Sequence, residues 1–418
     1  MKPKISFSEE QKDWIKRPLL SNIEKILDYR GRTPKKLGLS WSDTGFLALS
    51  ALNVKNGYID FNADANYGDQ ELYDRWMGDN HLHKGQVVFT TEAPMGNVAQ
   101  IPNDDLYILS QRTIAFEVKH HLIREDFLAT LLRSPKIFNE LTSLSSGGTA
   151  KGVSQKSLSN LKVCVPASLD EQQAIGSLFS NLDDLLASYK DSLANYQALK
   201  ATMLSKMFPI AGQTIPEIRL DGFEGEWKFS SLGEQADITK LAGFEFTNHV
   251  VYSYEGQIPA IRGLNVKNQK VNLSDVKYID KSDFSKLDRS KLIEDDLLFT
   301  YVGTVGEVAR VPESVLWYLA PNVSRLRLNS ALDSRFVLYQ MASNRFKQKQ
   351  IFPLIATSSQ PALSMANIRK FIISFPTLEE QQAIGSYFSN LYNLINSHQE
   401  KISQLETLKK KFLQDMFV

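Results

Sequence analysis

The feature that most constrains this chain is an internal repeat. Residues 169–177 read Leu-Asp-Glu-Gln-Gln-Ala-Ile-Gly-Ser, and residues 378–386 repeat them 209 positions later with a single Asp-to-Glu change. A repeat of this length constrains architecture more firmly than the helix or strand propensity of any one segment. The chain is therefore expected to contain two copies of one unit.

The segments that precede the repeated motif also correspond, although more loosely. Leu-Asn-Val-Lys-Asn occurs at 52–56 and again at 264–268, and Trp14 has a counterpart in Trp227. Between such landmarks the two copies diverge. Because function is carried mainly by loops on a shared framework, this pattern predicts one task carried out on two different targets.

Each repeated motif opens a long segment with helical character. Residues 170–208 contain no proline and one glycine, and their apolar residues follow a seven-residue cycle. At 1.5 Å per residue, such a helix is roughly 57 Å long. A narrow apolar stripe needs a partner, so the two helices are expected to pair with each other. The residues expected to pair them are Ile175, Leu178, Leu182, Leu185, Ile384, Tyr387, Leu391 and Leu394.

The segments before the helices have mixed character. Residues 86–90, 112–118 and 162–165 predict strands, whereas 126–144 and 334–350 carry helical patterns. The fold class is therefore α/β, with mixed α+β modules. The expected divisions are a first module at 1–167, a helix at 168–209, a second module at 210–377 and a helix at 378–418.

Composition limits the possible classes of protein. Lys and Arg number 48 against 47 Asp and Glu, so the net charge of +1 creates no overall basic field, and any DNA contact must come from local patches. The single cysteine, Cys164, excludes an internal disulfide framework. No apolar run is long enough for a membrane span, and the start lacks a signal-peptide core, so we expect a cytoplasmic protein.

Motifs for catalysis are weak. The sequence has no phosphate-binding loop ending in Lys-Ser or Lys-Thr and no Gly-x-Gly-x-x-Gly. His81, His83 and the pair at 120–121 have no Cys or acidic residue at a convincing metal-ligand spacing, so we expect no metal site. The order Asp104, Glu117 and Lys119 resembles that of metal-dependent nucleases, but a half-exposed strand gives the same pattern.

Groups suited to DNA binding are better represented. The turn at 29–36, Tyr-Arg-Gly-Arg-Thr-Pro-Lys-Lys, combines four cations with a hydroxyl, which suits phosphate contact but is also typical of a solvated turn. The small polar loop at 145–152 offers backbone N–H groups to an anion. The candidates in the first module are Arg30, Arg32, Thr33, Lys35, Lys36, Thr91, Gln111, Arg112, Thr149 and Lys151. The candidates in the second module are Thr300, Tyr301, Thr304, Asn322, Arg325, Ser358, Ser359 and Gln360.

Taken together, these motifs resemble those of the specificity subunit of type I restriction-modification systems. The resemblance rests on two variable modules, each followed by a helix that opens with Leu-x-Glu-Gln-Gln-x-Ile-Gly. Arg-Gly-Arg-Thr-Pro at 30–34 and the segment 216–227 are also similar to family patterns. The second module departs from the family at 241–246, Leu-Ala-Gly-Phe-Glu-Phe, so no role is transferred to that stretch.

The resemblance implies a non-catalytic protein with two target recognition domains held apart by an antiparallel helix pair. Such a protein reads two DNA half-sites separated by a spacer. It recruits two methyltransferase subunits that use S-adenosylmethionine and motor-nuclease restriction subunits that use ATP and Mg²⁺. The chain itself is then expected to hold no cofactor.

Two alternatives from other classes remain open. A coiled-coil scaffold explains the paired helices and predicts no DNA binding. A metal-dependent nuclease that uses Asp104, Glu117 and Lys119 predicts magnesium-dependent cleavage by the isolated chain.

Overall fold

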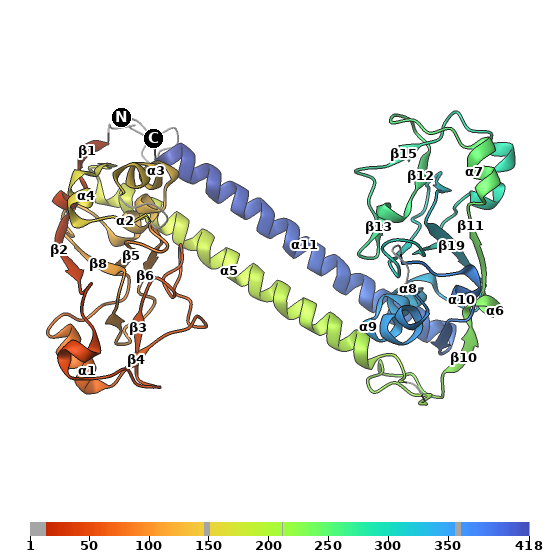
Figure 1. Cartoon of the computed structure of the whole chain (residues 1–418), viewed down its shortest axis with the longest axis horizontal. Coiled ribbons are helices and arrows are strands. Elements are labelled where there is room, and N and C mark those ends of the chain that lie inside the picture. The colour runs from red at the N-terminus through yellow and green to blue at the C-terminus, as the bar shows by residue number, and fades with distance from the viewer. Residues whose placement is uncertain (1–13, 146–150, 211, 356–360, 418) are drawn as a thin grey trace. The chain divides into compact units, whose positions relative to one another are not determined.

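The structure is a computed structural model that describes residues 14–145, 151–210, 212–355 and 361–417. It contains two compact units, one made of Met1–Asp191 with Glu400–Val418 and the other of Ser192–Gln399 (Figure 1). Two long helices, α5 (Leu169–Lys206) and α11 (Leu378–Met416), contribute residues to both units.

The described residues of the first unit form three small sheets. A four-stranded antiparallel sheet has the order β2-β8-β5-β6, a three-stranded sheet has the order β4-β3-β7, and β1 pairs with β9. The strands expected at 86–90, 112–118 and 162–165 are present as β5, β8 and β9. The strands are β1 (Ile15–Pro18), β2 (Ile23–Asp28), β3 (Phe46–Leu49), β4 (Tyr67–Gly68), β5 (Val87–Thr90), β6 (Val98–Gln100), β7 (Ile108–Leu109), β8 (Thr113–Val118) and β9 (Lys162–Val165).

The second unit repeats this topology. Its four-stranded sheet has the order β11-β19-β16-β17, its three-stranded sheet has the order β15-β12-β18, and β10 pairs with β20. The sequence repeat is therefore a repeat of sheet order. The strands are β10 (Lys228–Ser231), β11 (Ala236–Lys240), β12 (Pro259–Ile261), β13 (Val266–Lys267), β14 (Lys270–Val271), β15 (Lys277–Tyr278), β16 (Leu297–Thr300), β17 (Val308–Arg310), β18 (Tyr318–Leu319), β19 (Val323–Leu328) and β20 (Ile372–Phe375).

The shorter helices complete each module. The first module has α1 (Gln70–Met77), α2 (Glu125–Leu132), α3 (Pro135–Leu144) and α4 (Gln155–Asn160). The second has α6 (Leu232–Gln235), α7 (Gly243–His249), α8 (Ser334–Ala342), α9 (Asn344–Phe346) and α10 (Met365–Arg369), with a π-helical turn at Lys347–Ile351. Both modules therefore mix helices and strands, as the sequence predicts.

The helical segment expected at 126–144 is divided into α2 and α3. Ser134 has extended backbone angles and caps α3, with its side chain accepting a hydrogen bond from the backbone N–H of Ile137. Pro135 follows at the first position of α3, where a proline loses no helical hydrogen bond. Ser343 caps α9 in the same way in the second module. The apolar periodicity continues across the break, which is why it did not reveal the division.

The repeated motif attaches each long helix to its module. Gln172 is fully buried, and its side chain accepts from the backbone N–H of Arg124 (2.9 Å) while donating to the carbonyls of Leu122 and Pro166. Gly176 allows close approach, because a Cβ there would lie 2.5 Å from the Cβ of Asp126. The Gln and Gly of the motif therefore dock the start of α5 against the start of α2.

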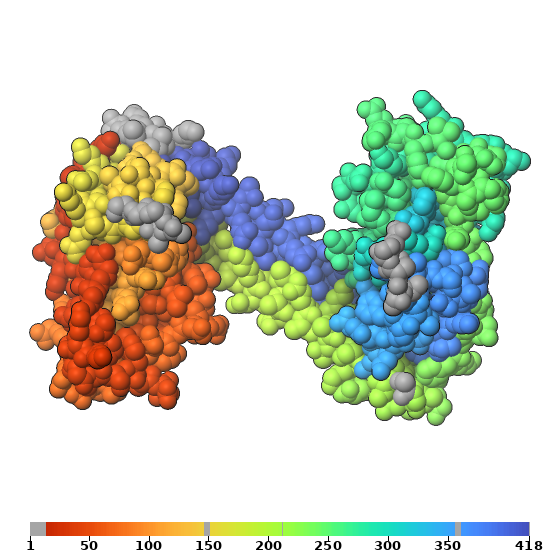
Figure 2. All heavy atoms as spheres, viewed as in Figure 1, coloured from red at the N-terminus to blue at the C-terminus, as the bar shows by residue number. Residues whose placement is uncertain are grey.

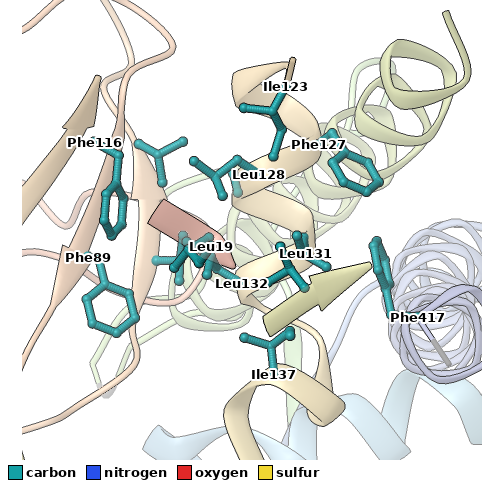
Figure 3. Close-up of a cluster of buried hydrophobic side chains, with 14 of the residues drawn as sticks. Leu19, Phe89, Phe116, Ile123, Phe127, Leu128, Leu131, Leu132, Ile137 and Phe417 are labelled. Atoms are coloured by element: carbon teal, nitrogen blue, oxygen red, sulfur yellow. The ribbon is translucent and has the colours of Figure 1, made fainter. Parts of the chain in front are cut away.

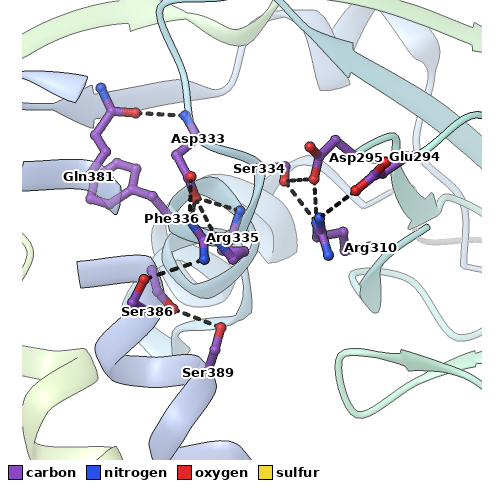
Figure 4. A network of polar contacts seen from close by, with 11 residues as sticks. Glu294, Asp295, Arg310, Asp333, Ser334, Arg335, Phe336, Gln381, Ser386 and Ser389 are labelled. Atoms are coloured by element: carbon purple, nitrogen blue, oxygen red, sulfur yellow. Dashed lines mark hydrogen bonds and ion pairs between the residues drawn. The ribbon is translucent and has the colours of Figure 1, made fainter. Parts of the chain in front are cut away.

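The second unit makes the same attachment (Figure 4). The side chain of Gln381 accepts from the backbone N–H of Asp333 (3.0 Å) and donates to the carbonyl of Ala331. The Arg335 guanidinium donates to the hydroxyl of Ser386 (3.3 Å), which adds a contact between α8 and α11. The motif therefore has the same structural role in both copies.

The far end of α11 completes the core of the first module. Phe417 is 4% exposed, and its ring centroid lies 5.8 Å from those of both Trp14 and Phe127. Phe179 of α5 approaches the same Phe417 ring at 6.3 Å. Figure 3 shows Phe417 with Phe127 in this core. In the space-filling view, the blue end of α11 packs directly against the yellow part of the first module (Figure 2).

The end of α5 has the equivalent role in the second unit. Phe208 is 4% exposed, and its ring lies 6.1 Å from Trp227, 5.4 Å from Phe336 and 6.1 Å from Phe388. The helix that leaves one module therefore ends in the core of the other. Rings at these separations and tilts are well packed and favourable.

The two long helices pair in antiparallel fashion within each unit. In the first unit, Asp183 contacts Lys409 and Lys190 pairs with Glu406 at 2.7 Å, so numbering rises along α5 as it falls along α11. In the second unit, Tyr196 packs on His398 with ring centroids 5.2 Å apart. The expected antiparallel pairing is confirmed inside each unit.

The buried row on each helix differs in part from the expected one. Ile175, Leu182, Ile384 and Leu391 are buried, and Leu178 and Tyr387 pack partly buried against the cores, but Leu185 and Leu394 are 42% and 43% exposed. The positions next to these two, Leu186 and Ile395, are buried instead at 7% each. The first turns of each helix face a module as well as the other helix, so the buried stripe is wider than a coiled-coil seam and shifts around the helix.

Among the described residues, no helix combines the length and the apolar character needed to cross a membrane.

We predict that Phe417→Ala lowers the free energy of unfolding by about 3–5 kcal/mol, because it leaves a cavity among Trp14, Phe127 and Phe179. Urea denaturation of the full chain measures this loss. The matched control is Leu408→Ala on α11, where the side chain is 38% exposed and the expected change is within about 0.5 kcal/mol. Equal effects of the two substitutions would contradict the role assigned to Phe417.

Candidate nucleic-acid interface

The topology of the four-stranded sheet gathers polar groups at one edge of the first module. Strands β2 and β5 flank β8 in antiparallel register, with Asp28 opposite Ile114 and Thr90 opposite Thr113. The ends of β2 and β5 therefore lie where β8 begins. We call the residues collected there the first strand-end cluster, which comprises Asp28, Arg30, Thr91, Glu92, Arg112 and Val153.

Backbone hydrogen bonds hold this cluster together. The N–H of Thr91 donates to the carbonyl of Arg112 (2.8 Å), and the N–H of Val153 donates to the carbonyl of Thr91 (2.9 Å). The Arg112 side chain is 53% exposed and lies 3.3 Å from a carboxylate oxygen of Glu92. These bonds therefore join three segments that are separate in sequence, and Arg112 is presented at the surface.

Arg30 is held inside this arrangement by Asp28. Its Nε donates to both carboxylate oxygens, at 2.8 and 3.0 Å, and its Nη1 reaches the carbonyl of Val153 at 3.4 Å. Burial alone would raise the pKa of Asp28, but hydrogen bonds from Arg30 and from Gln155 lower it below its ordinary value. Arg30 is therefore a positioning residue at the base of the cluster, with its side chain 30% exposed.

The remaining cations of the basic turn differ in how they are held. The guanidinium of Arg32 lies 4.5 Å from the ring of Tyr29 and donates to the carbonyl of Trp76. Thr33 caps a short 3₁₀ helix at Pro34–Leu37. Lys35 and Lys36 are exposed on that helix, and the Lys36 ammonium donates to the carbonyl of Gly31 (2.7 Å). The two lysines are the cations of this turn that are best placed to meet a phosphate.

The second module forms an equivalent group, which we call the second strand-end cluster and define as Lys240, Tyr301, Asn322 and Leu363. The N–H of Tyr301 donates to the carbonyl of Asn322 (3.2 Å), and the N–H of Leu363 donates to the carbonyl of Tyr301 (2.8 Å). The Lys240 ammonium lies 5.5 Å from the centre of the Tyr301 ring. The backbone arrangement is the same as in the first module, whereas the side chains differ.

Two residues in these clusters share an uncommon backbone conformation. Arg112 has φ = 64° and Asn322 has φ = 72°, and each stands in the turn that leads into the central strand β8 or β19. Positive φ is uncommon for residues other than glycine, and such residues are enriched at functional sites. Both side chains are exposed. At these two equivalent positions the repeat presents different hydrogen-bonding side chains on the same backbone conformation.

Several expected contact residues have other roles. The side chains of Thr91 and Thr300 are buried and bond to neighbouring backbone carbonyls, so neither can reach DNA. Arg325 is 5% exposed on β19, where it bonds to Asp237 and to the carbonyl of Arg289. The expectation that Arg325 contacts DNA is therefore wrong. Strand β19 lies between β11 and β16, and the buried Arg325 side chain is bonded to groups of its own module.

The remaining candidates lie beside the clusters or outside the described part of the chain. Gln111, Lys151 and Thr304 are exposed next to cluster segments. Thr149, Ser358, Ser359 and Gln360 lie outside the described residues. The segments that contain them lead directly into Val153 and Leu363.

Sequence reasoning missed Asp28, Glu92 and Lys240. Asp28 and Glu92 are acidic, so a search for phosphate-binding cations passed over them. Lys240 stands at the position equivalent to Asp28, since Asp28 pairs with Ile114 and Lys240 with Ser324. An alignment of the two copies by strand register, rather than by identity, would have found this reversal of charge.

A metal site or a metal-dependent nuclease would need several metal ligands close together. Among the described residues, no group of three or more His, Cys, Asp or Glu could hold a metal ion. His81 bonds to the hydroxyl of Tyr73 (2.7 Å), and His83 pairs with Glu125 at 3.0 Å. Asp104 accepts from the backbone N–H of Lys84 (3.3 Å).

The sequence matches the profile of a known family twice. The family is described as the type I restriction modification DNA specificity domain, and its matches cover residues 30–195 and 224–407. Each match spans most of one module and most of the helix that follows it.

Individual relatives carry consistent names. The specificity subunit of the type I restriction enzyme MjaVIII from Methanocaldococcus jannaschii is 23% identical over 317 residues, which are 73% of this chain and 72% of the relative. A putative MjaX specificity subunit from the same organism is 22% identical across 98% of this chain and 94% of its own length. The EcoKI specificity subunit of Escherichia coli K12 is 22% identical over 68% of this chain and 61% of its own length.

One solved structure has the same fold. The S subunit of a type I restriction-modification system from M. genitalium aligns with a TM-score of 0.64 over all of this chain and 99% of that one, at 14% identity. The likeness supports the repeated arrangement of modules and helices.

We predict that Arg30→Gln lowers the free energy of unfolding by roughly 1–3 kcal/mol, because Asp28 loses its charged hydrogen-bond donor. The lowered pKa of Asp28 stabilises the native protein above the unfolded pKa, and this stabilisation is lost as pH falls through the folded pKa. The variant should therefore lose less stability than the wild type between neutral and acid pH. Urea unfolding as a function of pH measures both effects.

The control for this experiment is Arg75→Gln. Arg75 pairs with Glu71 one helical turn away, and both side chains are more than half exposed, so the expected loss is about 0.5 kcal/mol or less. A neutral effect of Arg30→Gln would show that Arg30 is not held as described.

Proposed function

Because the chain belongs to the type I restriction-modification DNA specificity family, we propose that it is the specificity subunit of such a system and that each module reads one half of a bipartite DNA target. The observation that carries this proposal is the double family match, one over each module. The role of the chain is DNA target specificity, and the relatives are likewise named specificity subunits.

The strand-end clusters are the proposed reading sites. Equivalent backbone positions present Arg112 in one module and Asn322 in the other, both exposed. Arginine forms bidentate hydrogen bonds with guanine, and asparagine forms them with adenine, in the major groove. We therefore assign Arg112 to a guanine in one half-site and Asn322 to an adenine in the other.

Phosphate contact is assigned to cations beside these readers. Lys35, Lys36 and Lys151 are exposed near the first cluster, and Lys240 stands in the second. Contacts to phosphate set orientation and general affinity, whereas contacts to base edges set specificity. A chain of net charge +1 fits this division, since much of the phosphate affinity of an assembly can come from its other subunits.

Chemistry is assigned to partner subunits. We propose that the chain is not an enzyme and binds two methyltransferase subunits, which use S-adenosylmethionine. We further propose that it joins motor-nuclease restriction subunits that use ATP and Mg²⁺, and that the complex works in the cytoplasm. A coiled-coil scaffold without DNA binding and a metal-dependent nuclease are the competing functions. The paired helices also fit a scaffold, whereas no group of three or more His, Cys, Asp or Glu in the described residues could hold the metal of a nuclease.

The main test is methylation mapping after co-expression with the methyltransferase subunit of the same system. The wild type should produce a methylated two-part motif. Arg112→Ala should relax or change one half of the motif, and Asn322→Ala should change only the other half, because each bidentate base contact contributes about 1–3 kcal/mol of discrimination. The two variants act as controls for each other.

An unchanged motif in both variants would remove the assignment of the strand-end clusters as readers. Methylation that is indifferent to the presence of the chain would leave the scaffold as the better function. Magnesium-dependent cleavage of DNA by the isolated chain would favour the nuclease.

A second prediction concerns the exposed lysines of the basic turn. Replacing Lys35 and Lys36 with Ala should weaken DNA binding by the assembled complex on all sequences and reduce the slope of log K against log salt by about 1.8, or 0.9 for each lost phosphate contact. Fluorescence anisotropy at several salt concentrations measures the slope. Lys16 and Lys162, exposed on β1 and β9, form a control pair with the same change of charge. If replacing either pair reduces the salt slope equally, the basic turn is not a preferred site of phosphate contact.

A further inference from the structure

One of the differences in charge between the two long helices lies at a partly buried lysine. The repeat offset of 209 residues relates Lys200 to Lys409 and Tyr392 to Asp183. In the first unit, Asp183 accepts from the Arg133 guanidinium (2.6 Å) and from the Lys409 ammonium. These three side chains are at most 25% exposed. A half-buried lysine is thus neutralised there by a carboxylate of the same chain.

The second unit lacks that carboxylate. The Lys200 ammonium instead lies 4.8 Å from the centre of the Tyr392 ring and 5.8 Å from that of Tyr339, and it donates to the side-chain oxygen of Gln269 (2.9 Å). Lys270 approaches the same Tyr392 ring, also at 4.8 Å. Burial lowers the pKa of Lys200. A ring face and an amide stabilise an ammonium only partly, because neither carries a negative charge.

A cavity of about 480 Å³ opens beside these groups within the second unit. Lys200, Tyr392 and Arg345 line it together with side-chain amides that include Gln269 and Asn396, and none of its lining residues is an Asp or Glu. Its volume is in the range of small-molecule sites.

Some hydrogen-bond donors that line this cavity have no acceptor within the described residues. Arg345 donates one hydrogen bond, to the carbonyl of Phe208 (3.1 Å), and it pairs with no carboxylate in the described residues. The Asn396 amide nitrogen is buried without an acceptor in the same part of the chain. The Glu307 carboxylate accepts a hydrogen bond from the backbone N–H of the lining residue Asn268 (3.0 Å), but it is paired with Lys347 at 2.8 Å. It therefore does not neutralise the cavity.

We propose that this cavity binds a small phosphate-class oxyanion, which supplies Lys200 with the negative charge that the Asp183 carboxylate supplies to Lys409 in the first unit. Lys200 and Arg345 supply its charge partners, and the amide of Asn396 supplies a further donor. Charge-assisted hydrogen bonds of this kind are the strongest that a phosphate accepts. A concave cavity lined by two helices and a module suits a small anion better than the convex backbone of a DNA duplex. The site is separate from the strand-end clusters and goes beyond DNA reading.

The test is calorimetric titration of the full chain with inorganic phosphate at constant ionic strength. Wild-type protein should bind saturably. Lys200→Gln and Arg345→Gln should each weaken binding at least about tenfold, which corresponds to the loss of one charge-assisted hydrogen bond. Lys401→Gln, at an exposed lysine of α11 outside the cavity, should bind as the wild type does.

Tyr392→Asp is the decisive variant, because it builds the carboxylate of the first unit into the second. It should abolish phosphate binding while leaving the far-ultraviolet circular dichroism spectrum unchanged. Phosphate should raise the melting temperature of the wild type but not that of this variant, so a folding defect is distinguishable from a loss of the site.

Acetate provides the comparison between anions. It carries one charge and should bind more weakly than phosphate, whereas equal or tighter binding would overturn the assignment of a phosphate. Absence of saturable phosphate binding by the wild type, or undiminished binding by Tyr392→Asp, would overturn the site altogether. None of these results depends on DNA binding, so the failure of this proposal and of the proposed function are separable.

Discussion

The structure depends on one aromatic side chain at the end of each long helix. Phe417 packs among Trp14, Phe127 and Phe179, and Phe208 has the equivalent position in the second unit. Each helix therefore leaves one module and ends in the hydrophobic core of the other. Because burial of a large aromatic side chain is among the strongest local contributions to stability, neither module has a complete core without the helix of its counterpart.

The two modules share the contacts that attach the long helices but differ in the side chains of the strand-end clusters. A buried Gln and a close-packed Gly in the repeated motif attach each helix to its module, and these contacts recur with the same chemistry in both units. The strand-end clusters share backbone hydrogen bonds but present Arg112 in one module and Asn322 in the other. The two modules therefore share one attachment of the helices while differing in surface chemistry, as is typical of loops on a common framework.

The candidate site could be predicted from the sequence only in part. The basic turn was visible from residue type, whereas the equivalence of Arg112 and Asn322 follows from strand register, because each residue directly precedes the first residue of β8 or β19. The roles of Arg30 and Arg325 were not visible, because only the fold brings Arg30 against Asp28 and places Arg325 inside the sheet. An arginine in a basic turn and an arginine on a buried strand look alike until their partners are known.

The sequence by itself determined the repeated architecture, the two long helices, the mixed modules and the family, because all of these depend on periodicity and motifs that are local in the chain. Tertiary structure alone decided which face of each helix is buried. Leu186 and Ile395 are buried in place of the expected Leu185 and Leu394, because a module as well as the other helix packs against each long helix. It also decided that Lys409 has a carboxylate partner while Lys200 has an aromatic ring, because both pairs join helices that lie far apart in sequence.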